Sequence, residues 1–501
     1  MALRADLPAH ADTVVIGAGT AGAALAGTLA ERSDQTVLVL EAGPDYGPLD
    51  RDAWPDDLLD SRALPTSHQW GYDSASTYPD RVLPFDRARV IGGCSSHNGC
   101  AAIVGSPLDY DAWESAGCTG WGTDRLKPLF ASAIDRLRVR RPGDDEATPF
   151  QRSFLEAAPA IGVPRVQDLN EWDEEVGIAM SPVNVIDGVR WNAAFAYLDP
   201  VRGRPGLTIA GDAMVNRLVV DGGRVTAVEV VREGQLERVE CGRAVLTAGA
   251  YGSPVVLERS GIGHPAVLGQ FGIDVRVALS GVGRNLHDHP AVRLGFAGGD
   301  NAVAEMQAFA RDRWLPEEQT IAKLKSQHCG EGFDLHMYPV GGPDGDEWRW
   351  DVPVACMTPR SRGEIHLTGT DPEAIPAIDH AFLADIDAYD AMILADGVRI
   401  LRELAAIEPL RTFLGEEFDA GAPDELVRRR VEHYYHPVGS CKMAPESDPD
   451  AVVDPAGRVH GLENAYVADC AICPVIPRAN TNLPAAVIGL RIAELLLEDG
   501  V

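Results

Sequence analysis

The chain has 501 residues, of which 45% are hydrophobic and 24% are charged, and this ordinary globular composition excludes disordered and fibrous proteins. Its 44 Lys and Arg residues against 75 Asp and Glu residues give a formal net charge of −31, which disfavours nucleic acid and anionic membranes as partners. No apolar run reaches the ~18 residues of a membrane span, and the N-terminus lacks a secretory signal, so we expect a soluble, cytoplasmic protein.

The first predicted elements form a strand–helix–strand unit with the glycine pattern of dinucleotide-binding proteins. Residues 13–16 are typical of a buried strand, residues 23–31 are an alanine-rich helix, and residues 36–40 are a second buried strand. Glycines allow a tight turn, close approach of the backbone to a pyrophosphate, and close packing of helix on strand. An acid at the end of the second strand accepts ribose hydroxyls and repels the 2′-phosphate of NADP. The predicted cofactor-binding residues of this unit are Gly17, Gly19, Thr20, Ala21, Gly22 and Glu41.

The rest of the chain predicts an α/β fold, α+β overall, in which two domains alternate along the sequence. Residues 44–90 predict loops over a site, and residues 207–230 alternate apolar and polar side chains as in a β-meander. A buried strand at 244–247 leads into a helix near Ser253, and an amphipathic helix at 484–497 ends the chain. The predicted domains are a discontinuous nucleotide-binding domain, residues 1–155, 207–290 and 431–501, and a substrate domain, residues 156–206 and 291–430.

The nine cysteines are an odd number, and we expect reduced thiols. Cys470 and Cys473 have the spacing of a redox or zinc motif, but no second pair accompanies them. We therefore interpret them as small buried apolar residues.

Several further segments carry motifs of one enzyme family. They are residues 90–100 (VIGGCSSHNGC), 249–263, 281–290 (GVGRNLHDHP), 359–365, 436–443 (HPVGSCKM) and 478–484 (RANTNLP). From about residue 12 to 497 the chain resembles the glucose–methanol–choline (GMC) family of FAD-dependent alcohol oxidoreductases, and its segment GGCSSHN is most similar to the choline oxidase type. The resemblance implies a Rossmann-like FAD-binding domain and an inserted substrate domain with an antiparallel or mixed sheet and helices.

The family resemblance implies a catalytic pair from the last quarter of the chain. Oxidation of an alcohol removes a hydride from carbon and a proton from oxygen, so a base and a second polar group must meet the hydroxyl. The resemblance gives the role of base to His436 and the role of hydrogen-bonding partner to Asn480. Histidines 287 and 289 flank Asp288 and could suggest a metal, but the family implies a structural role for that segment, and we predict no metal.

The same resemblance implies how FAD is held. His97 matches the position at which choline oxidase-like members bond an imidazole nitrogen to the flavin 8-methyl carbon, and we favour that bond over simple packing. Val215 would bind adenine through its main chain. The other residues implied at the cofactor are Cys94, Ser95, Asn98, Gly99, Cys100, Ala101, Asp469, Ala471, Thr481 and Asn482.

The substrate departs from the choline oxidase type. Where that type has Glu after Asp-His-Pro, this chain has Ala291, so a trimethylammonium group would lack its counter-charge unless Glu305 supplies one. We expect a neutral primary alcohol (aryl, furanyl or medium-chain). The residues predicted to contact it are Trp54, Met306, Tyr434 and Tyr435.

The expected reaction is oxidation of this alcohol to an aldehyde, with dioxygen as the electron acceptor and hydrogen peroxide as the second product. A dehydrogenase that uses a quinone or carrier protein, a choline oxidase-like activity, a cyanohydrin lyase and a non-catalytic flavin-binding protein are the alternatives. The sequence leaves the exact alcohol, the acceptor and the oligomeric state open.

Overall fold

Short aliphatic and β-branched runs form the first sheet, where burial on both faces suits parallel strands. In the computed structural model, which describes residues 3–76, 78, 81–173, 176–313, 316, 319–344 and 347–498, the parallel part consists of β8 (Leu207–Ala210), β2 (Val37–Leu40), β1 (His10–Ile16) and β11 (Gln235–Leu246) in that order. β22 (Ala465–Val467) also runs parallel to β11. The antiparallel strands β10 (Arg224–Arg232) and β9 (Met214–Asp221) extend this sheet.

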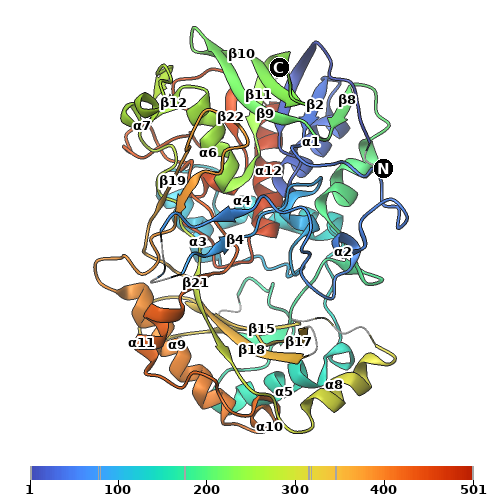
Figure 1. The fold of residues 1–501 in the computed structure, drawn as a ribbon, viewed down its shortest axis with the longest axis vertical. Coiled ribbons are helices and arrows are strands. Elements are labelled where there is room, and N and C mark those ends of the chain that lie inside the picture. The colour runs from blue at the N-terminus through green and yellow to red at the C-terminus, as the bar shows by residue number, and fades with distance from the viewer. Residues whose placement is uncertain are drawn as a thin grey trace.

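Two helices from opposite ends of the sequence lie side by side against the first sheet (Figure 1). They are α1 (Thr20–Arg32) and α12 (Asn482–Glu498), drawn in blue and red. Their contact is close because both present small residues. A Cβ added at Gly489 would lie 2.2 Å from the carbonyl oxygen of Ala21. The C-terminal helix is thereby held beside the turn that follows β1.

The second sheet is antiparallel and lies at the other end of the molecule (Figure 1). Its strand order is β21 (Glu432–His433), β14 (Pro290–Gly295), β18 (Glu347–Cys356), β16 (Leu335–Met337), β15 (Thr320–Leu324) and β5 (Gly177–Met180), and β17 (Val340–Asp344) also pairs with β18. The helices around it are α5 (Pro149–Ala157), α8 (Ala302–Ala310), α9 (Tyr389–Ala405), α10 (Leu410–Leu414) and α11 (Pro423–Arg430).

The remaining helices are α2 (Asp56–Leu59), α3 (Pro107–Ser115), α4 (Thr123–Arg136), α6 (Gly249–Arg259) and α7 (Pro265–Gln270). The short paired strands are β3 (Tyr72–Asp73) with β4 (Pro84–Phe85), β6 (Val185–Ile186) with β7 (Val189–Arg190), β12 (Ile262–Gly263) with β13 (Val277–Ala278), and β19 (Glu364–His366) with β20 (Ala377–Asp379). Among the described residues, no helix combines the length and apolar character that crossing a membrane requires. All nine cysteines lie in the described part of the chain and are free thiols.

The structure refines the sequence predictions at several element boundaries. Residues 207–210 belong to the parallel sheet as β8, beside β2, and the meander begins only at β9. Packing crosses the predicted domain boundaries at three places. Helix α5 packs into the core of the second sheet, residues 194–198 pack on α1, and β21 pairs with β14.

Candidate active site

One cavity of about 440 Å³ runs between the two sheets, from the turn after β1 to the face of the second sheet. Most of the residues predicted to bind cofactor or substrate line it, although they come from widely separated segments. They are Gly17, Gly19, Thr20, Ala21, Glu41, Cys94, His97, Asn98, Gly99, Cys100, Ala101, Val215, Tyr434, Tyr435, His436, Asp469, Asn480, Thr481 and Asn482.

The turn after β1 is shaped for close approach of backbone to a ligand. Gly17 has φ 106°, and a Cβ there would lie 2.5 Å from the Thr247 carbonyl oxygen. Only glycine fits that conformation without strain. Helix α1 begins three residues later with no acidic side chain in its first turn, so its free N–H groups can face a phosphate.

Glu41 lies in the same end of the cavity as a fixed acceptor. Its carboxylate accepts hydrogen bonds from the main-chain N–H groups of Ala18 and Gly43, each at 2.9 Å. Burial raises the pKa of Glu41 to about 7, and those two N–H donors oppose the rise. The lone pairs that remain on the two oxygens can accept ribose hydroxyls, as the sequence predicts.

Two buried amide atoms in the cavity have no hydrogen-bond partner among the described residues, so they are suited to bind a polar ligand. The Oδ1 atom of Asn480 and the Nδ2 atom of Asn482 have no hydrogen-bond partner among the described residues, whereas Oδ1 of Asn482 accepts from the Thr20 hydroxyl at 2.8 Å. Buried amide groups without partners cost free energy unless something binds them. Together with the glycine turn and Glu41, they fit a dinucleotide with a polar ring system at its far end.

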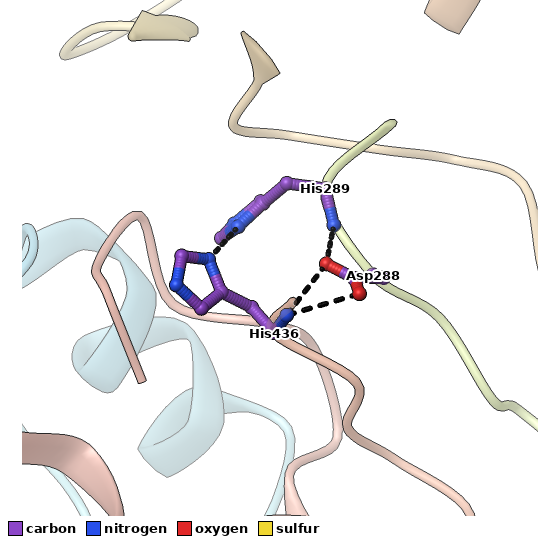
Figure 2. Close-up of side chains that lie close together, drawn as sticks. All are labelled: Asp288, His289 and His436. Carbon is purple, nitrogen blue, oxygen red and sulfur yellow. Dashed lines mark hydrogen bonds between the residues drawn. The ribbon is translucent and has the colours of Figure 1, made fainter. Parts of the chain in front are cut away.

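His436 lies in a buried cluster with Asp288 and His289 (Figure 2). Its ring Nδ1 is 3.1 Å from Nδ1 of His289. Both carboxylate oxygens of Asp288 accept the main-chain N–H of His436 at 3.0 Å, and one also accepts that of His289 at 2.7 Å. The cluster therefore fixes the backbone and the ring of His436, while its Nε2 remains for the cavity.

The surroundings keep His436 uncharged. Burial, and then electrostatic interaction with His289 and with the charged Arg87, lowers the pKa of His436 well below its usual value. Burial likewise lowers the pKa of His289 to about 3 and raises that of Asp288 to about 7. A neutral imidazole can accept a proton at neutral pH, which is what a base for alcohol oxidation needs.

The three side chains of this cluster also have the composition of a metal site. In this structure the same atoms form hydrogen bonds within the protein. The Asp288 oxygens accept main-chain N–H groups, and Nδ1 of His289 faces Nδ1 of His436. His287 is occupied as well: its Nδ1 faces the carbonyl oxygen of Asn285 at 2.6 Å and its Nε2 accepts from the main chain of Ile476 at 2.9 Å. The prediction of no metal remains a prediction.

The residue before the predicted base has unusual backbone geometry. Tyr435 has φ 65°, a left-handed conformation that is costly for a bulky residue. Arg87 donates from Nη2 to the Tyr435 carbonyl oxygen at 2.9 Å, and the ring of Tyr435 packs on that of His433 with centroids 4.2 Å apart. These contacts hold the strained segment that places His436 in the cavity.

His97 lines the cavity and is almost completely buried. Its Nε2 lies 2.6 Å from the Ser67 carbonyl oxygen, so Nε2 carries the proton and Nδ1 has the lone pair. Burial lowers the pKa of His97, which favours the neutral imidazole.

Two predicted substrate residues do not reach the cavity, and the structure corrects them. Trp54 packs on Phe195 with ring centroids 4.7 Å apart and donates from Nε1 to the Gly47 carbonyl oxygen, which places it in the core beside α1. Met306, a residue of α8, is fully buried in the core beside the second sheet. Glu305, on the same helix, is exposed and does not line the cavity.

Three predicted cofactor residues support the cavity wall from behind. Gly22 lets α1 pack on the turn, Ser95 accepts from the main chain of Ala193 at 2.9 Å, and Ala471 donates its N–H to Asp469 at 2.8 Å. None of the three lines the cavity. Sequence reasoning also missed lining residues that no motif marks, namely Asp86, Arg87, Arg293, Tyr338 and Arg349.

Comparison with known proteins decides the family. Two family models described as GMC oxidoreductase match residues 11–291 and 359–489. The chain belongs to the GMC oxidoreductase family. This GMC oxidoreductase acts on CH–OH groups, as predicted, and the family supports FAD as the cofactor for which the cavity is shaped.

Relatives of this GMC oxidoreductase match it over nearly its whole length. It is 31% identical to an oxygen-dependent choline dehydrogenase of Sinorhizobium fredii, over 97% of this chain and 96% of the relative. It is also 31% identical to the mitochondrial choline dehydrogenase of Homo sapiens, over 96% and 89%. The structure of pyridoxine 4-oxidase from Mesorbium loti superposes with a TM-score of 0.87 at 28% identity, over 98% and 99%, which confirms the predicted fold class.

Proposed function

We propose that this protein oxidises a neutral primary alcohol (aryl, furanyl or medium-chain) to the aldehyde. One observation carries the proposal: His436 and Asn480 line the same cavity as the glycine turn and His97, although 44 positions separate the pair in the sequence. FAD, when bound, would accept the hydride from the carbinol carbon and pass two electrons to dioxygen, which gives hydrogen peroxide.

The roles of the two residues follow from their contacts. If Nδ1 of His436 donates to His289, Nε2 has the lone pair and takes the hydroxyl proton of the substrate. The Asn480 carboxamide can donate to the same oxygen as negative charge develops there, and such a donor contributes ~3 kcal/mol to transition-state stabilisation. Burial of the site excludes bulk water from the reacting atoms.

Choline is the second candidate, and relatives favour it. Two of the similar proteins are named choline dehydrogenases. Asp86 is exposed and lines the cavity, as does Tyr435, so it offers a carboxylate near the substrate end. Burial is the main cause that raises the pKa of the Tyr435 hydroxyl, and the charges of Glu432 and Asp86 add to it. Against choline, Ala291 stands where the choline oxidase type has Glu.

Anaerobic mixing of the holoenzyme with alcohols tests the proposal. Benzyl alcohol or hydroxymethylfurfural is expected to bleach the flavin absorbance, and air should then release one hydrogen peroxide per alcohol. Bleaching without peroxide would favour the dehydrogenase alternative with another acceptor. No bleaching by any primary alcohol would contradict the proposed function, and bleaching by choline alone would favour the second candidate.

We also propose that His97 is bonded to the flavin 8-methyl carbon. The ring nitrogen would replace one hydrogen of the methyl group, with a net loss of two hydrogen atoms that dioxygen takes up as hydrogen peroxide. The position of His97 in the cavity wall supports the bond. Acid-precipitated protein should then stay yellow, whereas precipitated His97→Ala should be colourless, and a colourless wild-type pellet would contradict the bond.

We also propose, as the sequence predicts, that the protein is located in the cytoplasm.

A further inference from the structure

The cavity wall beyond His436 is aromatic and ends at an arginine. The ring of Tyr434 lies 4.5 Å from that of His436, and Tyr338 stacks on Tyr434 with centroids 5.2 Å apart. Arg293 follows on β14 and lines the same cavity as Tyr338 and Tyr435. It stands opposite Pro353 in the strand pairing, and the carbonyl oxygen of Pro353 accepts the main-chain N–H of Tyr338 at 3.4 Å. The wall thus leads from the predicted base to a cation.

Arg293 is held from the side that faces away from the cavity. Its Nε lies 3.2 Å from the Glu432 carboxylate and its Nη1 lies 3.5 Å from the Asp351 carboxylate. Both carboxylates line a separate hollow of about 250 Å³ that Arg293 also borders, and neither lines the main cavity. The side-chain hydrogen bonds that Arg293 makes in the described part of the chain use its Nε and Nη1 atoms. The guanidinium is therefore anchored and retains N–H groups to donate.

The strand register links Arg293 to the substrate position. Side chains two residues apart on a strand point to the same face, so Ala291 and Arg293 share one face of β14. Ala291 packs with Tyr338 and Tyr434 on that face. Ala291 is buried and does not line the cavity, whereas Arg293 does. A ligand that extends from His436 along the aromatic wall therefore meets the positive charge of Arg293, and the negatively charged Glu that the choline oxidase type has at position 291 is absent.

The charge balance favours an uncharged ligand group over an anion. Glu432 and Asp351 already compensate Arg293, and Arg349, which also lines the cavity, lies 3.5 Å from Asp351 through its Nε. A carboxylate bound at Arg293 would lie close to both acids, whereas a carbonyl oxygen or an aromatic nitrogen would accept a hydrogen bond without that repulsion.

Resting on the proposed function, we propose that Arg293 is a specificity-determining residue that binds the end of the substrate opposite the reacting CH₂OH group. The preferred substrate is then a flat primary alcohol with an uncharged hydrogen-bond acceptor at that end, and alcohols with a quaternary ammonium group are excluded. Asp86 is the carboxylate that would act against this selectivity, because it lines the cavity near Tyr435.

A matched pair of alcohols tests the contact. Hydroxymethylfurfural and furfuryl alcohol share the ring and the CH₂OH group, and only the first carries a formyl acceptor at the opposite end. Wild-type enzyme is expected to prefer hydroxymethylfurfural ~10- to 100-fold in kcat/KM, the factor of one hydrogen bond to a charged donor. In Arg293→Met, the ratio of the two kcat/KM values should fall to the ratio of the intrinsic reactivities of the alcohols, mainly because KM for hydroxymethylfurfural rises. Arg293→Lys should give an intermediate ratio.

The controls separate this contact from folding and from the reaction itself. Arg224→Met makes the same substitution at an exposed arginine of β10, which pairs with Glu463, and should leave the ratio as in wild type. Flavin absorbance identifies folded variants, and Arg293→Lys keeps the ion pairs if Arg293→Met does not fold. An unchanged ratio in both Arg293 variants would overturn the proposal, as would efficient oxidation of choline that Asp86→Asn abolishes. Failure of every alcohol to bleach the flavin would instead reject the proposed function.

Discussion

At the scale of single residues, the proposed chemistry depends on how His436 is held. One ring nitrogen faces His289, and the main chain is bound by Asp288, so the ring has one orientation and one nitrogen for the substrate. Such fixation matters because a base must lie within hydrogen-bond reach of the proton that it removes. The same contacts keep the imidazole buried and neutral.

We expect His436→Ala to reduce the rate of anaerobic flavin reduction ~10²- to 10⁴-fold, because the variant loses general base catalysis. Flavin content should be retained, since the glycine turn, Glu41 and His97 are unchanged. Stopped-flow absorbance measures the rate. The matched control is His328→Ala, at an exposed loop histidine, which should react like wild type. A near-normal rate in His436→Ala would remove this residue from the mechanism.

The pH dependence of the reaction reports on the same residue. A histidine whose pKa is lowered stays unprotonated as the pH falls through 6.5, so the base form of His436 persists in mildly acidic solution. We therefore expect that the rate of flavin reduction does not fall as the pH is lowered through 6.5. Asp288, with a pKa of about 7, titrates nearby, and Asp288→Asn shows whether a step near pH 7 belongs to it. If the reduction rate fell with a midpoint at pH 6.5 in both the wild type and Asp288→Asn, the interpretation of His436 as a buried, neutral base would be contradicted.

At the scale of elements, the packing of α1 on the turn after β1 decides whether the cofactor end of the cavity exists. A Cβ added at Gly22 would lie 2.0 Å from the Gly17 carbonyl oxygen and 2.6 Å from Oγ1 of Thr247. Backbone and a hydrogen-bonded hydroxyl cannot move away cheaply. The helix would have to shift, and the turn that faces the phosphates would shift with it.

We expect Gly22→Ala to lower the free energy of unfolding by ~2 kcal/mol or more, through overpacking. Gly269→Ala is the matched control, because Gly269 also lies in a helix, α7, and a Cβ there meets nothing within 4 Å. That control should be neutral or stabilising by up to ~1 kcal/mol, since alanine favours helix. Urea unfolding midpoints measure both effects, and equal midpoints would contradict the packing argument.

Elements with strong local patterns were predictable, and elements defined by distant partners were not. The runs at 13–16 and 36–40 lie within or overlap β1 and β2, and the alanine-rich stretch lies within α1. Residues 207–210 also alternate, but β8 joins the parallel sheet because it lies beside β2, a neighbour that alternation cannot reveal. The prediction places Trp54 at the substrate because an aromatic ring in the loops over the site suits the wall of a substrate pocket, yet its indole fills the core.

At the scale of the whole molecule, the site belongs to neither sheet alone. His436 follows β21 of the second sheet, Asn480 precedes α12, and Glu41 follows β2 of the first sheet. The sequence predicted all three, because the family resemblance marks His436 and Asn480 and the strand–helix–strand pattern marks Glu41. Arg87 and Arg293 carry no motif, and their positions depend on how the two sheets meet, so the sequence alone could not assign them.

Because both sheets contribute to the cavity, FAD should stabilise the molecule as one unit. In His97→Ala, which permits removal of the cofactor, saturating FAD at ~1,000 times Kd should add ~4 kcal/mol to the free energy of unfolding. For a chain of 501 residues that corresponds to a Tm increase of roughly 4 °C. Differential scanning calorimetry should show a single transition that shifts, and two transitions of which only one responds would contradict the expectation.

The pairing of β21 with β14 sets Pro290 opposite His433 and Ala291 opposite Glu432, three and two positions from Arg293. The strand that selects the alcohol is therefore hydrogen-bonded to the strand that delivers the base. Substitutions at residues 291–293 that admit bulkier alcohols should therefore also displace His436 and lower the turnover rate. Libraries that vary residues 432–435 at the same time can restore the position of His436.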